Sequence, residues 1–146
     1  MMTSKVVAIG SDLHLLGRFK NILRRNGPLT EFKTKRLCQR ILNEKHELPL
    51  FQKYMRKNDI DSCSNVMAGA WCVKEAIYKC LDSQDQKTFR MAQWWKSHDV
   101  NGKPIIKNEN YFKTDKGKAE EFFCTISHDG NYIFSIVLRQ KNDIKH

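Results

Sequence analysis

The sequence has no long apolar stretch. Its longest apolar runs, residues 6–9 and 132–138, are far shorter than the roughly 20 residues that a helix needs to cross a bilayer. The first five residues lead directly into a strand-like run, which leaves no room for a signal peptide. We therefore expect a chain without a membrane span.

Cysteine pairing motifs are also missing. The five cysteines are an odd number, contain no C-x-x-C pair and do not lie beside histidines at the spacing of zinc ligands. This pattern excludes the common disulfide frameworks and zinc modules. We expect reduced and mostly buried thiols at Cys38, Cys63, Cys72, Cys80 and Cys124.

Linkers, internal repeats and low-complexity tracts are absent as well. A chain of 146 residues with 40% hydrophobic and 29% charged residues has the size and balance of one globular domain that buries its own core. The sequence therefore predicts a single domain over residues 1–146.

Acidic residues are scarce in one segment. The formal net charge is +10. Residues 18–40 contain eight basic residues and only one acidic residue, Glu31. A concentrated positive charge predicts an acidic partner. The basic residues of this segment are Arg18, Lys20, Arg24, Arg25, Lys33, Lys35, Arg36 and Arg40.

The first elements are predicted from short local patterns. Residues 5–9 form a β-branched run that predicts a strand ending in a turn at Gly10, so that Asp12 and His14 follow the strand. A basic helix is expected from Gly17 until the Asn-Gly-Pro sequence at residues 26–28.

The middle of the chain is predicted to be helical. Pro49 suits the first turn of a helix that has Leu50, Phe51, Tyr54 and Met55 facing inward and ends near residue 58. Residues 64–81 have apolar side chains at three- and four-residue steps, which predicts a long central helix. A second stripe of this helix carries Trp71, Glu75 and Lys79.

The last third is predicted to contain most of the strands. A hairpin is expected over residues 88–106, a short helix over 115–121, and two strands at 122–127 and 132–138 around a turn at 128–131. One strand, several helices and then more strands is the order of an α+β fold.

Three motifs occur in a characteristic order. They are Gly-Ser-Asp at residues 10–12, Trp-Cys-Val-Lys-Glu-Ala at 71–76 with a further lysine at 79, and Ser-His at 127–128. Secondary matches are Arg-Ile-Leu-Asn at 40–43 with Glu47, and Asn-Gly-Lys-Pro at 101–104. This ordered set resembles the 4'-phosphopantetheinyl transferase superfamily, and the small size resembles its holo-[acyl-carrier-protein] synthase type.

The resemblance implies an activity and a set of site residues. Members transfer phosphopantetheine from coenzyme A to a carrier-protein serine with magnesium, which hard oxygen ligands hold. It implies Asp12 and Glu75 as metal ligands, with Glu75 or a metal-bound water as the base. Lys79 and His128 are implied as catalytic and coenzyme A-binding residues, with Lys103 and Pro104 also contacting coenzyme A.

Two positions depart from the family pattern. Bacterial relatives commonly have an arginine at the position of Ala70, where it helps to bind the phosphates of coenzyme A. In this chain another cation must replace it, or the affinity for coenzyme A is lower. The charged residue that usually follows the aspartate is also missing. His14 could occupy that space, so the sequence leaves open whether the metal has a third protein ligand.

Assembly and partners are further implications of the resemblance. It implies a long central helix packed on an antiparallel sheet and a homotrimer, in which some coenzyme A contacts come from a neighbouring copy. Acyl carrier proteins are acidic, and complementary charge orients docking. We therefore expect Arg18, Arg24 and Arg25 to dock the carrier protein.

Each feature alone has a simpler explanation. An aspartate after a strand is often a turn residue, and Glu75 with Lys79 is an ordinary helix-surface pair. The alternative functions are a non-enzymatic basic nucleic-acid-binding module and a degenerate homologue that binds coenzyme A or carrier protein without turnover. The likeness of the central motif to fungal sequences favours a mitochondrial location, otherwise a cytoplasmic one.

Overall fold

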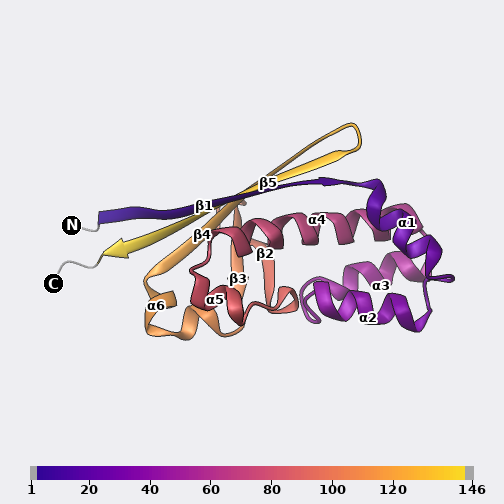
Figure 1. Ribbon diagram of the computed structural model, residues 1–146, viewed down its shortest axis with the longest axis horizontal. Coiled ribbons are helices and arrows are strands. Elements are labelled where there is room, and N and C mark those ends of the chain that lie inside the picture. Colours follow the sequence, from indigo (N-terminus) through magenta and orange to yellow (C-terminus); the bar gives the residue numbers. More distant parts are fainter. Residues whose placement is uncertain (1–2, 144–146) are drawn as a thin grey trace.

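A computed structural model describes residues 3–143 of the chain. One five-stranded sheet with strand order β1-β5-β4-β3-β2 carries the helices on one side (Figure 1). The elements are, in chain order, β1 (Thr3–Leu15), α1 (Gly17–Arg25), α2 (Phe32–Ile41), α3 (Leu48–Arg56), α4 (Ile60–Cys80), α5 (Ser83–Lys87), η1 (Met91–Gln93), β2 (Trp94–His98), β3 (Pro104–Asn108), η2 (Tyr111–Lys113), α6 (Asp115–Lys118), β4 (Glu120–Asp129) and β5 (Tyr132–Asp143).

All paired strands are antiparallel, and the first and last strands lie side by side. β1 pairs with β5 from Thr3 to Leu15, and β5 pairs with β4 over the length of that strand. Because both ends of the described chain belong to one sheet, this pairing is consistent with a single domain. The predicted α+β fold, with a long helix on an antiparallel sheet, is confirmed.

Helix α4 begins earlier than the apolar spacing predicts. Asp59 caps it by accepting a hydrogen bond from the Ser62 backbone amide at 3.1 Å, so the helix starts at Ile60 instead of residue 64. N-capping carboxylates satisfy backbone donors that the helix leaves free. Cys72, Val73, Ala76 and Ile77 of α4 are almost fully buried.

Gly10 lies inside β1, so the predicted end of the strand at this residue is wrong. A Cβ atom at Gly10 would lie 2.0 Å from the Ala76 carbonyl oxygen of α4. The glycine is therefore needed for close approach of strand and helix. β1 continues to Leu15 because it pairs with β5, and Asp12 and His14 lie within the strand.

Helices α1, α2 and α3 cover the first half of α4, at the right of Figure 1. The core between these helices contains Leu23, Phe51 and Cys63, each of which is at most 1% exposed. The prediction that Leu50 faces inward is wrong, since 47% of it is exposed. The other three predicted inward residues agree with the structure, since Phe51 is buried and Tyr54 and Met55 pack against the core.

The last third follows the predicted order with shifted boundaries. The short helix α6 ends at Lys118, and β4 starts at Glu120. β4 continues through His128 to Asp129, so the turn contains only residues 130 and 131. Among residues 3–143, no helix combines the length and apolar character that crossing a bilayer requires.

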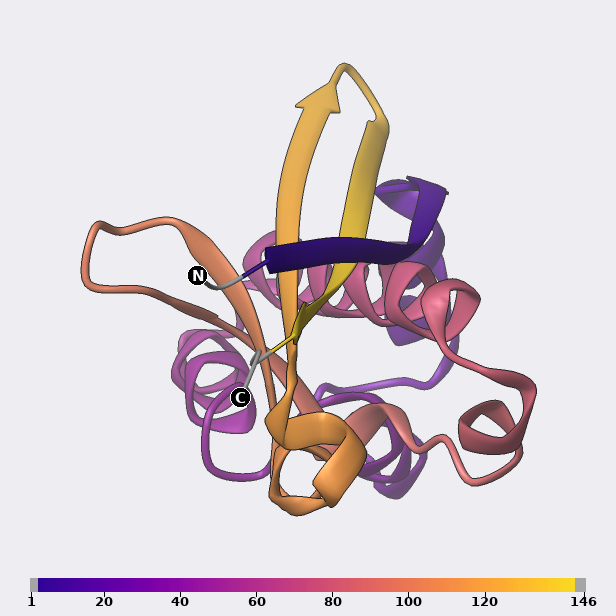
Figure 2. The same ribbon diagram turned by 90° about the vertical axis from the view of Figure 1, so that its left-hand side faces the viewer.

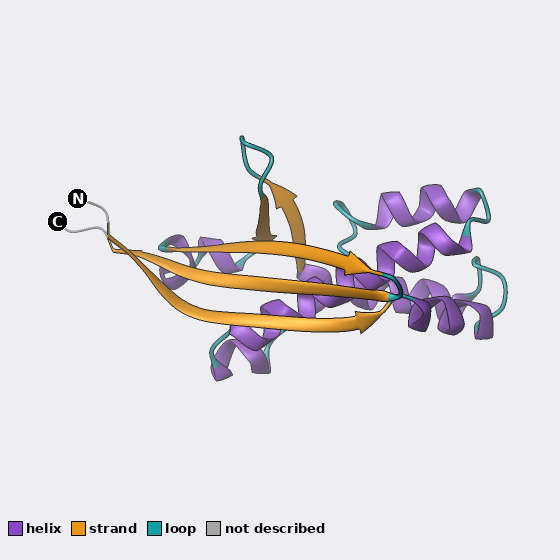
Figure 3. Cartoon of the chain, turned by 90° about the horizontal axis from the view of Figure 1, so that it is seen from above, coloured by secondary structure: helices purple, strands orange, loops and turns teal. Residues whose placement is uncertain are grey.

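One face of the sheet is covered by helices, and the other face is exposed. Figure 3 shows β1, β5 and β4 lying above the helices, with no element on their other side. We call this other side the outer sheet face; its side chains include Ile9 (62% exposed), Leu13 (61% exposed) and Phe134 (38% exposed). An apolar surface of this kind indicates an interaction site.

Candidate active site

Strand β1 and helix α4 bring Asp12, Glu75 and Lys79 together, and we call these three residues the acid–lysine cluster. The Lys79 ammonium lies 3.1 Å from Asp12 Oδ1 and donates a hydrogen bond to the Ser11 carbonyl at 2.8 Å. The Cys72 thiol donates to the Asp12 carbonyl at 3.3 Å. Helix spacing places Glu75 one turn before Lys79 on the same side of α4.

The surroundings of Glu75 shift the pKa of its carboxyl group upward. Burial raises the pKa of Glu75, the negative charge of Asp12 raises it further, and Lys79 opposes both effects. A like charge within a few ångströms has this effect on a carboxyl pKa. The charge of Asp12 therefore acts on Glu75 across the contact between β1 and α4.

The donor set suits magnesium. Magnesium prefers oxygen ligands, takes one or two protein carboxylates and keeps several waters. No group of three or more His, Cys, Asp and Glu side chains within residues 3–143 is arranged to hold a metal ion. Asp12 and Glu75 alone match a cation that retains part of its hydration shell.

His14 is packed in the core and does not complete a three-ligand set. The side chain is 3% exposed, and its ring centroid lies 5.3 Å from that of Phe19. Burial lowers the pKa of His14, with a further lowering by the nearby Arg18 charge. The negative charge of Asp12 opposes this lowering. The Nε2 atom of His14 has no hydrogen-bond partner among the described residues.

A cleft of about 840 Å³ opens beside Glu75, and we call it the Glu75 cleft. One wall is the face of α4 that carries Trp71, Glu75 and Tyr78. The opposite wall includes Arg40 at the end of α2 and Arg90 before η1. Its volume lies within the usual range of small-molecule sites.

A buried polar chain holds the opposite wall in place. Lys74 of α4 is 1% exposed, and its ammonium pairs with Glu47 and donates to the Ile41 carbonyl. The Glu47 carboxylate accepts from the Asn43 backbone amide at 2.8 Å. The Asn43 side chain donates to the Ala92 carbonyl at 2.8 Å, so α4, α2 and η1 are connected by hydrogen bonds.

Three of the predicted coenzyme A contacts, Lys103, Pro104 and His128, are not bonded to the acid–lysine cluster within the described residues. Lys103 lies in the loop between β2 and β3, and Pro104 is the first residue of β3; this hairpin projects from the body in Figure 2. His128 is exposed near the end of β4. Within residues 3–143, no hydrogen bond or ion pair joins these residues to the cluster.

The predicted docking arginines lie together on the short helix α1. Arg18, Arg24 and Arg25 are exposed, and Arg24 and Arg25 occupy its last turn. Arg18 lies close enough to the end of β1 for its charge to affect His14. The basic segment therefore adjoins the strand that carries Asp12.

Three residues that the structure places at or beside the site had no role assigned to them from the sequence. Arg90 lies between elements, where no periodic pattern marks it. Lys74 belongs to the central motif, but its burial could not be read from spacing. Asn43 was noticed only as part of a motif; its link to η1 spans 49 residues of sequence. The predicted free and buried cysteines are confirmed.

Comparisons with known proteins identify the family of this chain. The family model of the 4'-phosphopantetheinyl transferase superfamily matches residues 8–137. A holo-[acyl-carrier-protein] synthase of Streptococcus pyogenes serotype M1 is 30% identical over 138 residues, which cover 93% of this chain and 98% of that protein. One from Mycoplasma mobile is 26% identical over 135 residues, covering 92% of this chain and 91% of that protein.

Solved structures show the same fold. The acyl carrier protein synthase of Plasmodium yoelii with ADP bound has a TM-score of 0.72 at 18% identity, covering 97% of this chain and 99% of that one. The synthase of Bacillus anthracis in complex with coenzyme A (3',5'-ADP) has a TM-score of 0.63 at 20% identity, covering 93% and 97%. With the match over most of its length and a two-acid cluster on this fold, the chain belongs to the 4'-phosphopantetheinyl transferase superfamily.

Proposed function

We propose that this chain is a holo-[acyl-carrier-protein] synthase, which transfers 4'-phosphopantetheine from coenzyme A to a serine of an apo acyl carrier protein. The serine oxygen forms a bond to the β-phosphorus, and the bond from that phosphorus to the bridging oxygen breaks. Adenosine 3',5'-bisphosphate leaves with the bridging oxygen. The observation that carries the proposal is the proximity of Asp12, Glu75 and Lys79 on this fold.

Asp12 and Glu75 would hold magnesium in this site. When bound, the ion neutralises charge on the diphosphate, which is the main requirement of phosphoryl transfer. Lys79 adds a fixed positive charge beside Asp12 and would stabilise the charge that develops on the departing oxygen. Lys79 therefore acts as an electrostatic catalyst and as a contact to coenzyme A.

Glu75 is our candidate for the proton acceptor. Its raised pKa is the direction expected of a carboxylate that takes a proton near neutral pH. The serine proton then moves to the Glu75 carboxylate as the new phosphorus–oxygen bond forms. His128 contacts a phosphate of coenzyme A in this proposal, or shares in proton movement.

The active form is proposed to be a homotrimer. The exposed apolar side chains of the outer sheet face would be covered by a second copy, which removes them from water. A neighbouring copy would then bring His128, Lys103 and Pro104 to the acid–lysine cluster, which they do not reach within one chain. Replacing Leu13 with Glu should yield monomers in analytical ultracentrifugation, whereas an unchanged mass would contradict this interface.

Arg18, Arg24 and Arg25 are proposed to dock the acidic carrier protein. Exposed charges of this kind mainly raise association rates and are screened by salt. Changing all three to Gln should lower kcat/KM for the carrier protein by roughly tenfold at low salt, with KM for coenzyme A unchanged. A matched triple change at Lys53, Arg56 and Lys57, which lie at the end of α3, serves as the control.

The deciding experiment is a transfer assay followed by mass spectrometry. Apo carrier protein is mixed with coenzyme A, magnesium and the protein, and the phosphopantetheine arm should add its mass to the carrier. Asp12→Asn and Glu75→Gln should abolish transfer while the thermal midpoint stays close to that of the wild type, and Glu121→Gln, an exposed change on β4, should remain active.

Other results would favour the alternatives. Binding of coenzyme A without any mass gain would indicate a degenerate homologue. Salt-sensitive binding to nucleic acid that does not depend on Asp12 or Glu75 would indicate a nucleic-acid module. The mitochondrial location stays a prediction, which fractionation of the source cells would test.

A further inference from the structure

A second pocket, of about 270 Å³, lies between helices α2 and α3, which are neighbours at the right of Figure 1. We call it the α2–α3 pocket. None of Asp12, Glu75 and Lys79 lines it, and no residue of β1 or α4 contributes to its walls. The pocket is therefore separate from the acid–lysine cluster, and the transfer chemistry does not account for it.

The inner wall of this pocket is apolar. Leu29, Cys38 and Phe51 line it and are at most 6% exposed, and Met55 adds a partly buried thioether. Burial raises the pKa of the Cys38 thiol to about 12, so this group is uncharged at neutral pH. An apolar cavity of roughly 150 Å³ is enough to bind benzene. The larger α2–α3 pocket therefore has room for an aliphatic chain.

Polar side chains lie at the mouth of the pocket. Thr30, Lys35 and Gln39 line it and are exposed to solvent. The buried Thr34 hydroxyl accepts a hydrogen bond from the Asn26 side chain at 3.3 Å, so this oxygen already has a partner within the fold. A chain bound in the pocket would thus have its polar end on the solvent side.

One positive charge marks this mouth. Lys35 is the single ionised side chain of the lining, and none of the lining residues, all in the described part of the chain, is acidic. One ammonium group matches one negative charge. A dianion such as a phosphate monoester would retain excess charge beside an apolar wall, which is costly. Charge complementarity therefore favours a monocarboxylate.

We propose that the α2–α3 pocket binds an aliphatic monocarboxylate of medium chain length. The chain lies against Cys38 and Phe51, and the carboxylate lies beside Lys35. This binding goes beyond the proposed transfer and does not depend on it. Gln39 and Leu48 line both this pocket and the Glu75 cleft, so a ligand here contacts two side chains that the cleft shares.

The test uses octanoate and its uncharged analogue octanol. NMR of the isotope-labelled protein follows the backbone amide chemical shifts as each ligand is added. Octanoate should shift the amides of residues 29–39 and 48–55 in a saturable way. It should bind roughly threefold more tightly than octanol, since a single exposed charge pair contributes little.

Two variants and a control separate the chain from the charge. Lys35→Met should remove the preference for octanoate and leave octanol binding unchanged. Gln52→Trp fills the pocket, because Gln52 lines it but not the Glu75 cleft, and should weaken binding of both ligands by about tenfold or more. Lys33→Met, an exposed change on α2 that lines neither cavity, should bind both ligands as the wild type does.

Several results would overturn the proposal. Equal wild-type affinities for the two ligands, or the same loss of preference in Lys33→Met, would show that the Lys35 charge does not select the ligand. Shifts that centre on the outer sheet face, or that persist in Gln52→Trp, would place the chain elsewhere. An absence of saturable shifts would exclude the site. Lys35→Met changes only an exposed side chain, so it decides the matter even where Gln52→Trp does not fold.

Discussion

At the scale of single residues, the electrostatic surroundings of Glu75 decide what it can do. Burial and Asp12 raise its pKa, whereas Lys79 lowers it. The same lysine also contacts Asp12 at 3.1 Å. Lys79 therefore influences the protonation of one proposed metal ligand while it pairs with the other.

Replacing Lys79 with Met should affect both rate and pH dependence. Removing the positive charge raises the pKa of Glu75, so a higher pH is needed to form its carboxylate. The acidic limb of kcat/KM should move to higher pH, and kcat/KM should fall by roughly a hundredfold. Steady-state assays across pH, with carrier-protein modification as the readout, measure both quantities.

The control for this variant is Lys87→Met, an exposed change at the end of α5. It should leave the acidic limb and the rate as in the wild type. A Lys79→Met enzyme that is slower but keeps the wild-type acidic limb would contradict the coupling between Lys79 and Glu75.

At the scale of elements, the site depends on how closely β1 approaches α4. The absence of a side chain at Gly10 allows the strand to pack directly against the Ala76 carbonyl of α4. Two residues farther along β1, the Asp12 carbonyl accepts a hydrogen bond from the Cys72 thiol of α4. These contacts set the separation of Asp12 and Glu75, since one acid belongs to each element. A small change in packing here would move the two carboxylates apart.

Gly10→Ala should therefore destabilise the protein and reduce activity together. The added Cβ would lie 2.0 Å from the Ala76 oxygen, and overpacking of a core contact usually costs about 1–3 kcal/mol. Chemical denaturation gives the free energy of unfolding. Gly17→Ala is the matched control, because no atom lies within 4 Å of its new Cβ; equal stability of the two variants would contradict this account.

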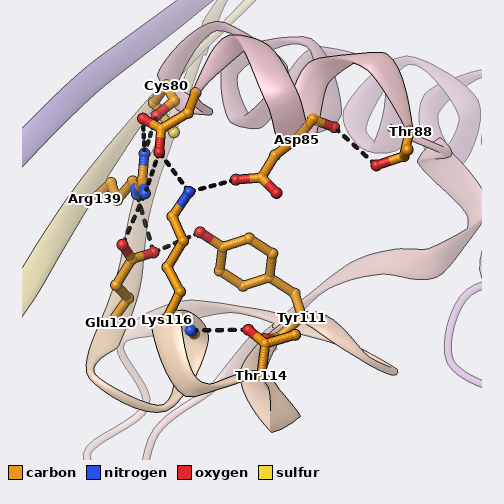
Figure 4. A network of polar contacts seen from close by, with 10 residues as sticks. Cys80, Asp85, Thr88, Tyr111, Thr114, Lys116, Glu120 and Arg139 are labelled. Carbon is orange, nitrogen blue, oxygen red and sulfur yellow. Dashed lines mark hydrogen bonds and ion pairs between the residues drawn. The ribbon is translucent and has the colours of Figure 1, made fainter.

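At the scale of the whole molecule, a polar network (Figure 4) joins the segment after α4 to α6, β4 and β5. In Figure 1, α5 and α6 lie at the opposite end of the fold from α1–α3. Arg139 of β5 is 1% exposed and pairs with Glu120 of β4 at 2.7 Å and with Asp82 at 2.9 Å. Lys116 of α6 pairs with Asp82 and lies 2.6 Å from Asp85. The network anchors the segment that follows Lys79.

Asp82→Asn should lower stability in a pH-dependent way. Hydrogen bonds from Arg139, then from Lys116, hold the pKa of Asp82 well below its ordinary value of 3.8. A depressed carboxyl pKa stabilises the fold above the unfolded-state value, and this contribution is lost as the pH falls through the folded-state pKa.

The variant should thus be less stable by about 1 kcal/mol at neutral pH, given that Asp82 is partly exposed. The difference from the wild type should shrink as the pH falls below 3.8. Urea denaturation at several pH values measures it. Asp115→Asn, at a fully exposed carboxylate, is the control, and a difference that does not vary with pH would contradict the role of the Asp82 charge.

The sequence by itself determined the features that depend on local order. The periodic apolar stripe of α4 predicted a helix because side chains three and four residues apart share a face. The order of the Gly-Ser-Asp, Trp-Cys-Val-Lys-Glu-Ala and Ser-His motifs predicted the family, which is confirmed. The role of Asp12 and Glu75 as joint metal ligands, which the resemblance implied, stays a prediction. The helical stripe and each single motif lie within a short segment, where neighbouring residues suffice.

Only the tertiary structure decided the features that depend on distant segments. The length of β1 follows from its pairing with β5, which lies more than a hundred residues away in the chain. The Glu75 cleft combines α4 with the end of α2 and the segment before β2, and burial of Lys74 depends on Glu47. No local pattern encodes such contacts, because the packing of whole elements brings them together.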